Sequence, residues 1–149
     1  ARELERAVEL ASIDREDAFA ALIIFDADDD DAIALEEELF ELIRGTVPLP
    51  TRISIAVREY EAWLLGAKVS LRGHQGIRLD ATAPANPEGI RSAKAELQAN
   101  MDRNRKYVET ADQVKLTGNM DLAAARAACP SFRRLIENVE RLVELVPLE

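Results

Sequence analysis

The sequence predicts a small α/β domain in which helices flank a parallel sheet and the C-terminal part, from about residue 88 to residue 149, is helical. Three observations lead to this prediction. Residues 19–25, FAALIIF, form a continuous apolar run of the kind that a parallel strand shows when both of its faces are covered. Residues 51–57, TRISIAV, alternate as a strand does. Segments with helical periodicity precede, separate and follow these two runs.

The size and composition of the chain are those of one folded domain. With 149 residues, of which 48% are hydrophobic, the chain can bury a core, and we expect a single domain over residues 1–149. A single cysteine excludes an intrachain disulfide and a zinc site built from several cysteines. The sequence contains neither a long apolar span nor a signal pattern, so we expect a cytoplasmic protein that is not associated with a membrane.

The charges are distributed unevenly along the chain. The net charge of −9 argues against a general electrostatic attraction to nucleic acid. Residues 1–48 hold 4 Lys/Arg against 15 Asp/Glu, whereas residues 49–106 hold 10 against 6. A metal in the acidic half and a phosphate-bearing substrate against the basic half would use this polarity. Solvated surface helices produce the same pattern.

The first half of the chain predicts helix, strand, helix, strand. The opening residues have helical spacing, and the run at 19–25 stops at Asp26. The next segment turns helical until Gly45, and we expect the aspartates at 29–31 to lie in its first turn, where they offset the helix dipole. Because a strand, helix, strand unit is almost always a right-handed crossover between parallel strands, both strands should end at the same edge. Asp26 and Glu59 are therefore expected to be neighbours.

The second half of the chain predicts mainly helices. Residues 58–68 show helical spacing, and residues 69–87 form a long segment without periodicity. Further helices are expected at about 88–101, 110–117 and 121–128. The last predicted helix begins at Ser131 as its N-cap, and its apolar stripe continues to Val146.

The strongest candidate site lies at the end of the first strand. Asp26 and Asp28 place two carboxylates on one side of the chain where open parallel sheets bind ligands, and such oxygen ligands suit Mg²⁺ or Mn²⁺. Aspartates that only cap a helix are the alternative. Glu59 could add a third carboxylate to a metal site or act as a general base, so the candidate catalytic and metal residues are Asp26, Asp28 and Glu59. Glu61 could be a solvated helix residue or could pair weakly with Lys68 across two turns.

Basic residues supply candidate phosphate contacts. These are Arg58, Lys94, Arg105 and Lys106. Surface lysines and arginines without any such role are the alternative. His74 is the only histidine, which excludes a site with several imidazoles and leaves it as a candidate site residue in the long loop or as a plain loop residue. The sequence contains no glycine-rich phosphate loop of either common spacing.

Several motifs together resemble one protein family. The segments FDADDDD, VREYEAWLLG, SLRGHQG, KYVETADQ and CPSF are similar to family 4276 of the domains of unknown function, which is grouped with Toprim-like proteins. The resemblance implies a Rossmann-like sheet with an Asp-x-Asp motif that holds Mg²⁺, and Asp26 and Asp28 match that motif. It also implies an ATPase as partner, because members of the family look like the small partners of ATPases in mobile defence modules.

One part of the Toprim pattern is not found in this sequence. Toprim chemistry also uses a glutamate after an earlier first strand, and no strand is predicted before residues 19–25. We expect this strand and its glutamate to lie upstream of Ala1, in an N-terminally truncated chain; otherwise the site is incomplete, with Glu59 as the candidate substitute.

Three functions follow for testing. The first is a magnesium-dependent Toprim-like nuclease that acts on phosphodiesters, in DNA, RNA or a small phosphate. The second is a non-catalytic protein-interaction module with the same fold. The third is a haloacid-dehalogenase-like phosphotransferase, because IIFDADD begins like the nucleophile motif of that superfamily, although Asp30 stands where the motif has Thr or Val.

Overall fold

The computed structural model describes residues 2–14 and 18–145 and shows a small α/β fold. The elements follow in the order α1 (Arg2–Asp14), β1 (Ala21–Asp26), α2 (Ala32–Ile43), β2 (Thr51–Ala56), α3 (Glu61–Gly66), η1 (Lys68–Leu71), η2 (Pro87–Gly89), α4 (Ala93–Ala99), α5 (Glu109–Thr117), α6 (Leu122–Ala128) and α7 (Pro130–Val143). The predicted small parallel sheet with flanking helices is confirmed.

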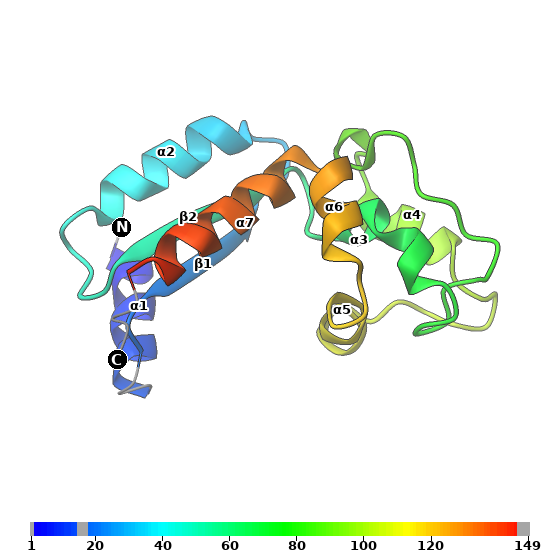
Figure 1. The fold of residues 1–149 in the computed structure, drawn as a ribbon, viewed down its shortest axis with the longest axis horizontal. Helices are drawn as coiled ribbons and strands as arrows, with labels where there is room; N and C mark the ends of the chain where they lie inside the picture. The colour runs from blue at the N-terminus through cyan, green and yellow to red at the C-terminus, as the bar shows by residue number, and fades with distance from the viewer. Residues whose placement is uncertain (1, 15–17, 146–149) are drawn as a thin grey trace.

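The elements lie in two groups, side by side (Figure 1). We call α1, β1, α2, β2 and α7 the sheet part, and residues 61–128, with α3 to α6, the helical part. The chain passes into the helical part after β2 and returns through α6 to α7. The ends of the two strands therefore face the helical part.

The two strands pair in parallel and end together. The register runs from Ala21 opposite Thr51 to Asp26 opposite Ala56. Asp26 is thus the last residue of β1, at the carboxyl edge of the sheet. This is the edge at which open parallel sheets bind ligands.

The prediction that the first strand is covered on both faces is wrong. Ile24 and Phe25 of β1 are 41% and 39% exposed, whereas β2 is almost entirely buried. The reason is that α2 and α7 pack mainly on β2, and β1 receives few contacts from either helix. An apolar run in the sequence indicates a strand that tends to be buried, but in this structure the helices bury β2 more than β1.

Helix α7 also closes the outer edge of β2. The buried Asn138 side chain donates its Nδ2 hydrogens to the Ile53 carbonyl at 2.9 Å and to Ser54 Oγ at 3.0 Å. These bonds satisfy a strand carbonyl that faces away from β1. Covering an edge in this way prevents it from pairing with another chain.

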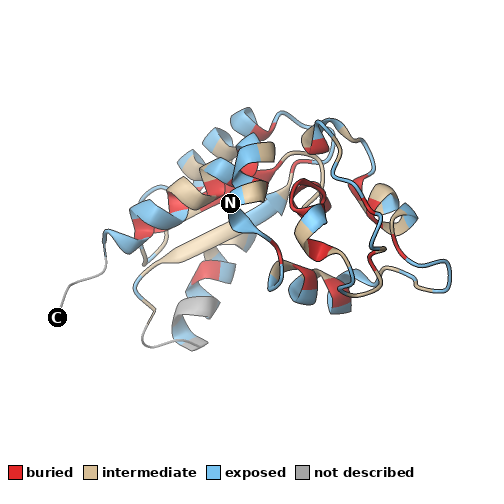
Figure 2. Cartoon of the chain, turned by 45° about the vertical axis from the view of Figure 1, so that its right-hand side comes forward, coloured by how far each residue is buried: buried red, intermediate tan, exposed pale blue. Residues whose placement is uncertain are grey.

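The main core forms around α3. All six residues of α3 are buried, and they appear as a red helix in the middle of the helical part (Figure 2). Trp63 donates its indole N–H to Ser131 Oγ at 2.7 Å and packs edge-on against Phe132. Gly66 allows α3 to approach α6 closely, because a Cβ at this position would lie 2.7 Å from Cys129 Sγ. Burial raises the pKa of the Cys129 thiol to about 12.

The predicted start of the second helix is wrong by one turn. Helix α2 begins at Ala32, so the aspartates at 29–31 precede it and none lies in its first turn. Asp31 is the N-cap, and its Oδ1 accepts hydrogen bonds from the Ile33 and Ala34 amides at 2.9 and 3.0 Å. A carboxylate at this position satisfies the spare N–H groups of the first turn, which is why the helix starts after the acidic run.

Other helix boundaries differ from the prediction where side chains make distant contacts. The segment predicted as a helix at 58–68 is helical only as α3, followed by η1, and the segment 88–101 contains η2 and the short α4. Ser131 is not an N-cap, since Cys129 holds that position, and the Ser131 hydroxyl instead contacts Trp63 and Glu88. The helices at 110–117 and 121–128 are confirmed to within one residue, and Val146 lies outside the described residues.

Within residues 2–14 and 18–145, no helix combines the length and the apolar character needed to cross a bilayer.

Candidate functional site

The loops that follow the two strands lie side by side at the carboxyl edge. The Ala27 amide donates to the Ala56 carbonyl and the Asp28 amide to the Arg58 carbonyl, both at 2.9 Å. The pairing of the strands thus continues for two residues beyond the sheet. As a result, the Asp26–Asp28 motif lies directly against the segment that contains Arg58 and Glu59.

Both loops contain a residue in the left-handed region of backbone conformation. Asp28 has φ 50° and Arg58 has φ 63°. Aspartate tolerates this region through local hydrogen bonding, but arginine rarely adopts it. Residues held in such conformations cluster at functional sites, because the surrounding structure must impose them.

Asp26 joins the two loops. Its Oδ1 accepts a hydrogen bond from the Tyr60 amide at 2.8 Å, so the predicted proximity of Asp26 to the Glu59 segment is observed. Burial raises the pKa of the Asp26 carboxyl, and the nearby carboxylates of Asp28 and Glu59 raise it further. The Tyr60 amide and the Lys94 ammonium act in the opposite direction. A cation bound nearby would lower the pKa of Asp26, because a positive charge favours the ionised carboxylate.

A small polar pocket of about 110 Å³ lies beside Asp28. It is lined by Asp28, Asp29, Arg58, Glu59 and Arg91. Asp29 binds both arginines: its Oδ1 lies 3.1 Å from Arg58 Nη1 and its Oδ2 lies 3.3 Å from Arg91 Nη2. Arg91 belongs to the helical part, so Asp29 connects the two parts of the molecule at the edge of the site.

Lys94 lies among several carboxylates, as the cation of an acidic group. Its Nζ lies 2.9 Å from Glu109 Oε2, and its backbone amide donates to Glu59 Oε2 at 2.8 Å. The Glu109 hydrogen bond raises the pKa of Lys94, and the charges of Glu61 and Glu59 contribute. Asp26 also interacts electrostatically with Lys94. Four carboxylates therefore surround one ammonium, and the group has an excess of negative charge.

Glu61 is a member of this group that the sequence analysis missed. It is fully buried rather than solvated. Its Oε1 accepts hydrogen bonds from Tyr107 Oη at 2.7 Å and from Gln113 Nε2 at 3.4 Å, and its Oε2 has no hydrogen-bond partner among the described residues. Burial raises the pKa of Glu61. The signal that could have revealed it is its place at the head of EAWLLG, a run that is otherwise entirely uncharged.

A larger cavity of about 380 Å³ opens next to Asp26, on the exposed side of β1. Its lining residues come from the end of β1 and from the helical part: Ile24, Phe25, Asp26, Tyr60, Glu109 and Gln113. The cavity has an apolar wall on β1 and polar groups opposite. We call the edge that carries Asp26, Asp28 and Glu59 the acidic edge. The cavity and the small pocket beside Asp28 make this edge accessible from two sides.

The carboxylates of Asp26, Asp28 and Glu59, predicted as metal ligands, do not converge on one point. In the described residues, no group of three or more His, Cys, Asp or Glu side chains is placed to hold a metal ion. Asp26 and Glu59 each direct one oxygen to a backbone amide, from Tyr60 and Lys94. The remaining oxygen donors of Asp26, Asp28 and Glu59 still suit Mg²⁺, which usually binds one or two carboxylates and completes its shell with water and substrate phosphate.

The other candidate residues fall into two sets. Arg58 and Lys94 lie at the acidic edge, as described above. Arg105 pairs with Asp112 and donates to the Gln75 carbonyl, Lys106 is exposed, and His74 is an exposed residue of the long loop. None of these three lines a pocket at the edge. The structure thus brings together five of the predicted residues and places three elsewhere in the helical part.

Fold and site define a small α/β protein with an acidic site at the carboxyl edge of its parallel strands. The chain belongs to the family described as domain of unknown function (DUF4276), whose model matches residues 2–140. No curated protein and no solved structure matches the chain.

Proposed function

We propose that this chain is a Mg²⁺- or Mn²⁺-dependent Toprim-like domain that cleaves phosphodiester bonds, acting in the cytoplasm as the partner of an ATPase. The observation that carries the proposal is the grouping of Asp26, Asp28 and Glu59 at one sheet edge beside Arg58 and Lys94. The ATPase partner rests on the family resemblance alone.

The charge balance supports a cation at this edge. Asp26 interacts with two further carboxylates and is half-buried, so its ionised form is disfavoured in spite of the nearby Lys94 ammonium. A divalent ion would stabilise the ionised carboxylates, lower the pKa of a bound water and offset the charge that develops on a phosphate.

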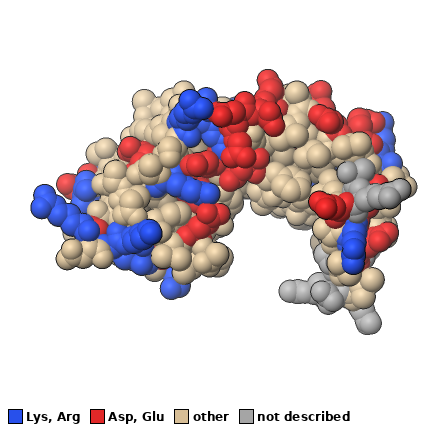
Figure 3. Space-filling model, turned by 180° about the vertical axis from the view of Figure 1, so that it is seen from behind, with Lys and Arg blue, Asp and Glu red and all other residues tan. Residues whose placement is uncertain are grey.

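The surrounding cations support a phosphate-bearing substrate. Arg58 and Arg91 flank the small pocket beside Asp28, and both are held in place by Asp29. Arginine forks recognise phosphate oxygens by paired hydrogen bonds. Over the face drawn in Figure 3, Lys and Arg gather on the helical part and Asp and Glu gather along the upper middle. A substrate that spans both regions would meet the polarity that the sequence predicts.

The protein's own groups give Asp26 and Glu59 different roles. Asp26 is fixed by the Tyr60 amide and keeps its second oxygen for a ligand. Glu59 is fixed by the Lys94 amide and could take the proton of an attacking water. Lys94 would offset negative charge at the phosphate.

The test is Mn²⁺ binding by calorimetry together with nicking of supercoiled plasmid DNA and of RNA. We expect Asp26→Asn and Asp28→Asn each to weaken Mn²⁺ binding by at least about tenfold, since one lost charged ligand is worth more than 1.4 kcal/mol, and to abolish cleavage. Asp30→Asn is the matched control, because Asp30 is exposed, belongs to the same acidic run and has no side-chain contact with the site. Equal Mn²⁺ affinity in all three variants would refute the proposal.

A non-catalytic interaction module is the second candidate. It is favoured by the lack of a three-ligand group among the described residues. This candidate predicts no saturable Mn²⁺ binding and no cleavage in the wild-type protein, so the calorimetry distinguishes the two functions.

A further inference from the structure

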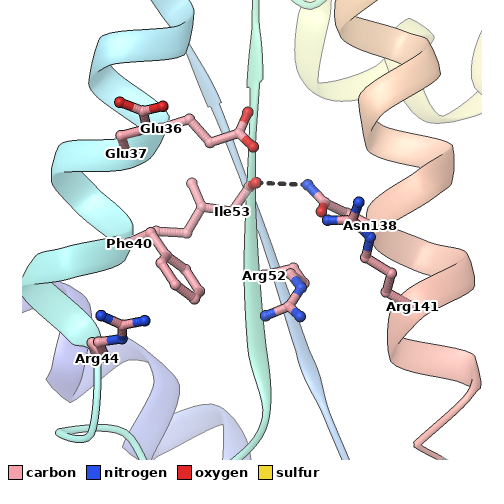
Figure 4. A pocket seen from close by; sticks show the side chains of 8 residues that line it. All are labelled: Glu36, Glu37, Phe40, Arg44, Arg52, Ile53, Asn138 and Arg141. Atoms are coloured by element: carbon pink, nitrogen blue, oxygen red, sulfur yellow. Dashed lines mark hydrogen bonds between the residues drawn. The ribbon is translucent and has the colours of Figure 1, made fainter.

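A second pocket lies away from the acidic edge, between α2 and α7. Its volume is about 400 Å³, within the range of small-molecule sites. Figure 4 shows α2 on one side of β2 and α7 on the other, with β1 behind. The lining residues are Glu36, Glu37, Phe40, Arg44, Arg52, Ile53, Asn138 and Arg141. It shares no residue with the pockets beside Asp26 and Asp28.

The pocket has a basic side and an acidic side. In Figure 4, Arg52 of β2 lies between Arg44 of α2 and Arg141 of α7, while Glu36 and Glu37 lie farther along α2. Among the described residues, no carboxylate forms an ion pair with Arg52 or Arg141. The Arg52 guanidinium carbon lies over the Phe40 ring, 5.6 Å from its centroid, in a cation–π contact.

Unpartnered buried polar atoms mark this region. Four buried side-chain polar atoms of the described residues have no hydrogen-bond partner; Glu36 Oε2 and Arg52 Nε belong to residues that line the pocket, and Arg134 Nε belongs to a neighbour of Glu36. Glu36 Oε2 and Arg134 Nε lie 3.7 Å apart and form an ion pair, at a distance too long for a hydrogen bond. Buried polar groups are almost always satisfied in folded proteins, so Arg52 Nε, which has neither a hydrogen bond nor an ion pair among the described residues, indicates a missing partner. Glu36 Oε2 can still accept a hydrogen bond beside its ion pair.

We propose that this pocket binds a small molecule that carries an oxyanion, phosphate or carboxylate, and a hydroxyl group. The oxyanion accepts hydrogen bonds from Arg52 and Arg141, and the hydroxyl donates to Glu36 Oε2. The positions of Arg44 and Arg141 at the C-terminal ends of α2 and α7 have an additional explanation, since cations there offset the helix dipoles. That explanation does not extend to the buried Nε of Arg52, which lies on a strand.

The test compares four probes by calorimetry on the full chain without divalent metal: inorganic phosphate, ribose 5-phosphate, glycerate and ribose. We expect ribose 5-phosphate to bind at least about tenfold more tightly than inorganic phosphate, and ribose not to bind. Tighter binding of glycerate than of ribose 5-phosphate would identify the oxyanion as a carboxylate; the reverse would identify it as a phosphate.

The variants assign the contacts. Arg141→Gln should weaken binding of the tighter probe at least about tenfold, as expected for the loss of a hydrogen bond to a charged group. Arg141 is exposed, so the Arg141→Gln variant should fold. Arg52→Lys keeps the charge but loses the planar guanidinium with its several donors, and it should show a similar loss of affinity for the probe. Glu36→Gln should reduce the advantage of ribose 5-phosphate over inorganic phosphate. Arg133→Gln, an exposed arginine of α7 outside the pocket, is the control.

Two results would overturn the proposal. One is the absence of saturable binding of every probe at 10 mM, a concentration about tenfold above a millimolar Kd. The other is an equal loss of affinity in Arg133→Gln and Arg141→Gln, which would show a general charge effect. Because the assay contains no metal and the pocket is separate from the acidic edge, neither result bears on the proposed cleavage activity.

Discussion

Glu61 shows how a single buried carboxyl can set the electrostatics of a site. It lies beneath the acidic edge and accepts hydrogen bonds from Tyr107 and Gln113 through one oxygen, while the other oxygen has no hydrogen-bond partner in the part of the chain that the structure describes. Burial, followed by the Glu61 carboxylate, raises the pKa of Tyr107, so this phenol remains protonated and donates to Glu61. The proton that Glu61 takes up at acidic pH and the charge that it carries at higher pH act directly on Lys94 and its partners.

The first prediction concerns the pH dependence of stability. Because the folded-state pKa of Glu61 is raised above its usual value, its contribution to stability is fully present below the unfolded pKa and is lost as pH rises through the folded pKa. Glu61→Gln removes this titration. We expect the free energy of unfolding of the variant, relative to wild type, to increase from pH 4 toward neutral pH, as measured by urea unfolding.

The control for this prediction is Glu38→Gln, at an exposed position of α2. Its difference from wild type should stay nearly flat over the same pH range. A Glu61→Gln difference that falls as pH rises would show that the carboxylate stabilises the fold.

At the residue scale, the sequence predicts part of the candidate site. The topology rule places Asp26, Asp28 and Glu59 at one edge, and the structure finds them there. The contacts of Glu61 and Arg91 could not be predicted, because they are made with residues distant in the sequence. Arg91 binds Asp29 from 62 positions away, and Glu61 accepts from Tyr107, 46 positions away.

At the scale of elements, the close approach of α3 and α6 depends on Gly66. A methyl group there would lie 2.7 Å from Cys129 Sγ and 3.3 Å from Ala128 Cβ. We expect Gly66→Ala to destabilise the protein by about 1–3 kcal/mol through overpacking, measured by chemical unfolding.

Gly118→Ala is the matched control for this change. A Cβ at Gly118 would meet the Val114 carbonyl at an ordinary 3.5 Å, and the residue has helical φ and ψ. Its effect should lie within about 0.5 kcal/mol of zero or be slightly stabilising. Equal effects of the two changes would contradict the packing argument.

Helix α7 holds β2 through Asn138. Replacing Asn138 with Ala removes the donor to the Ile53 carbonyl and leaves a buried acceptor unpaired. We expect a loss of about 1–3 kcal/mol in the free energy of unfolding. Asn119→Ala, which removes an exposed bond to the Lys115 carbonyl, should cost less than about 0.5 kcal/mol. A larger loss for Asn119 than for Asn138 would be evidence against this role of α7.

Elements with strong periodicity are those that the sequence predicts well. The strands, the crossover helix and the helices near 110–117 and 121–128 are all present. The errors have physical causes. The capping side chain of Asp31 fixes where α2 begins, and the position of α7 decides which strand is buried. Neither effect can be read from local apolar spacing.

For the whole molecule, the proposed metal binding at the acidic edge has a consequence for stability. A ligand that binds only the folded state at 100 times its Kd adds about 2.7 kcal/mol to the free energy of unfolding. We expect saturating Mn²⁺ to raise the thermal midpoint of the wild-type protein and of Asp30→Asn. The increase on adding Mn²⁺ should disappear in Asp26→Asn. The metal-free variant itself can be more stable than the wild-type protein, because it lacks a carboxyl whose pKa is raised by burial. An unchanged Mn²⁺ effect in Asp26→Asn would place the metal elsewhere.

The buried thiol of Cys129 makes the molecule convenient for site-specific labelling. Burial raises its pKa to about 12, so the thiol stays protonated at neutral pH, and the sulfur is buried next to Gly66. Cys129 is also the only cysteine in the chain. Cysteines introduced on exposed helices of the sheet part and the helical part would therefore react alone with maleimide probes, so the distance between the two parts could be followed spectroscopically without first replacing the native residue.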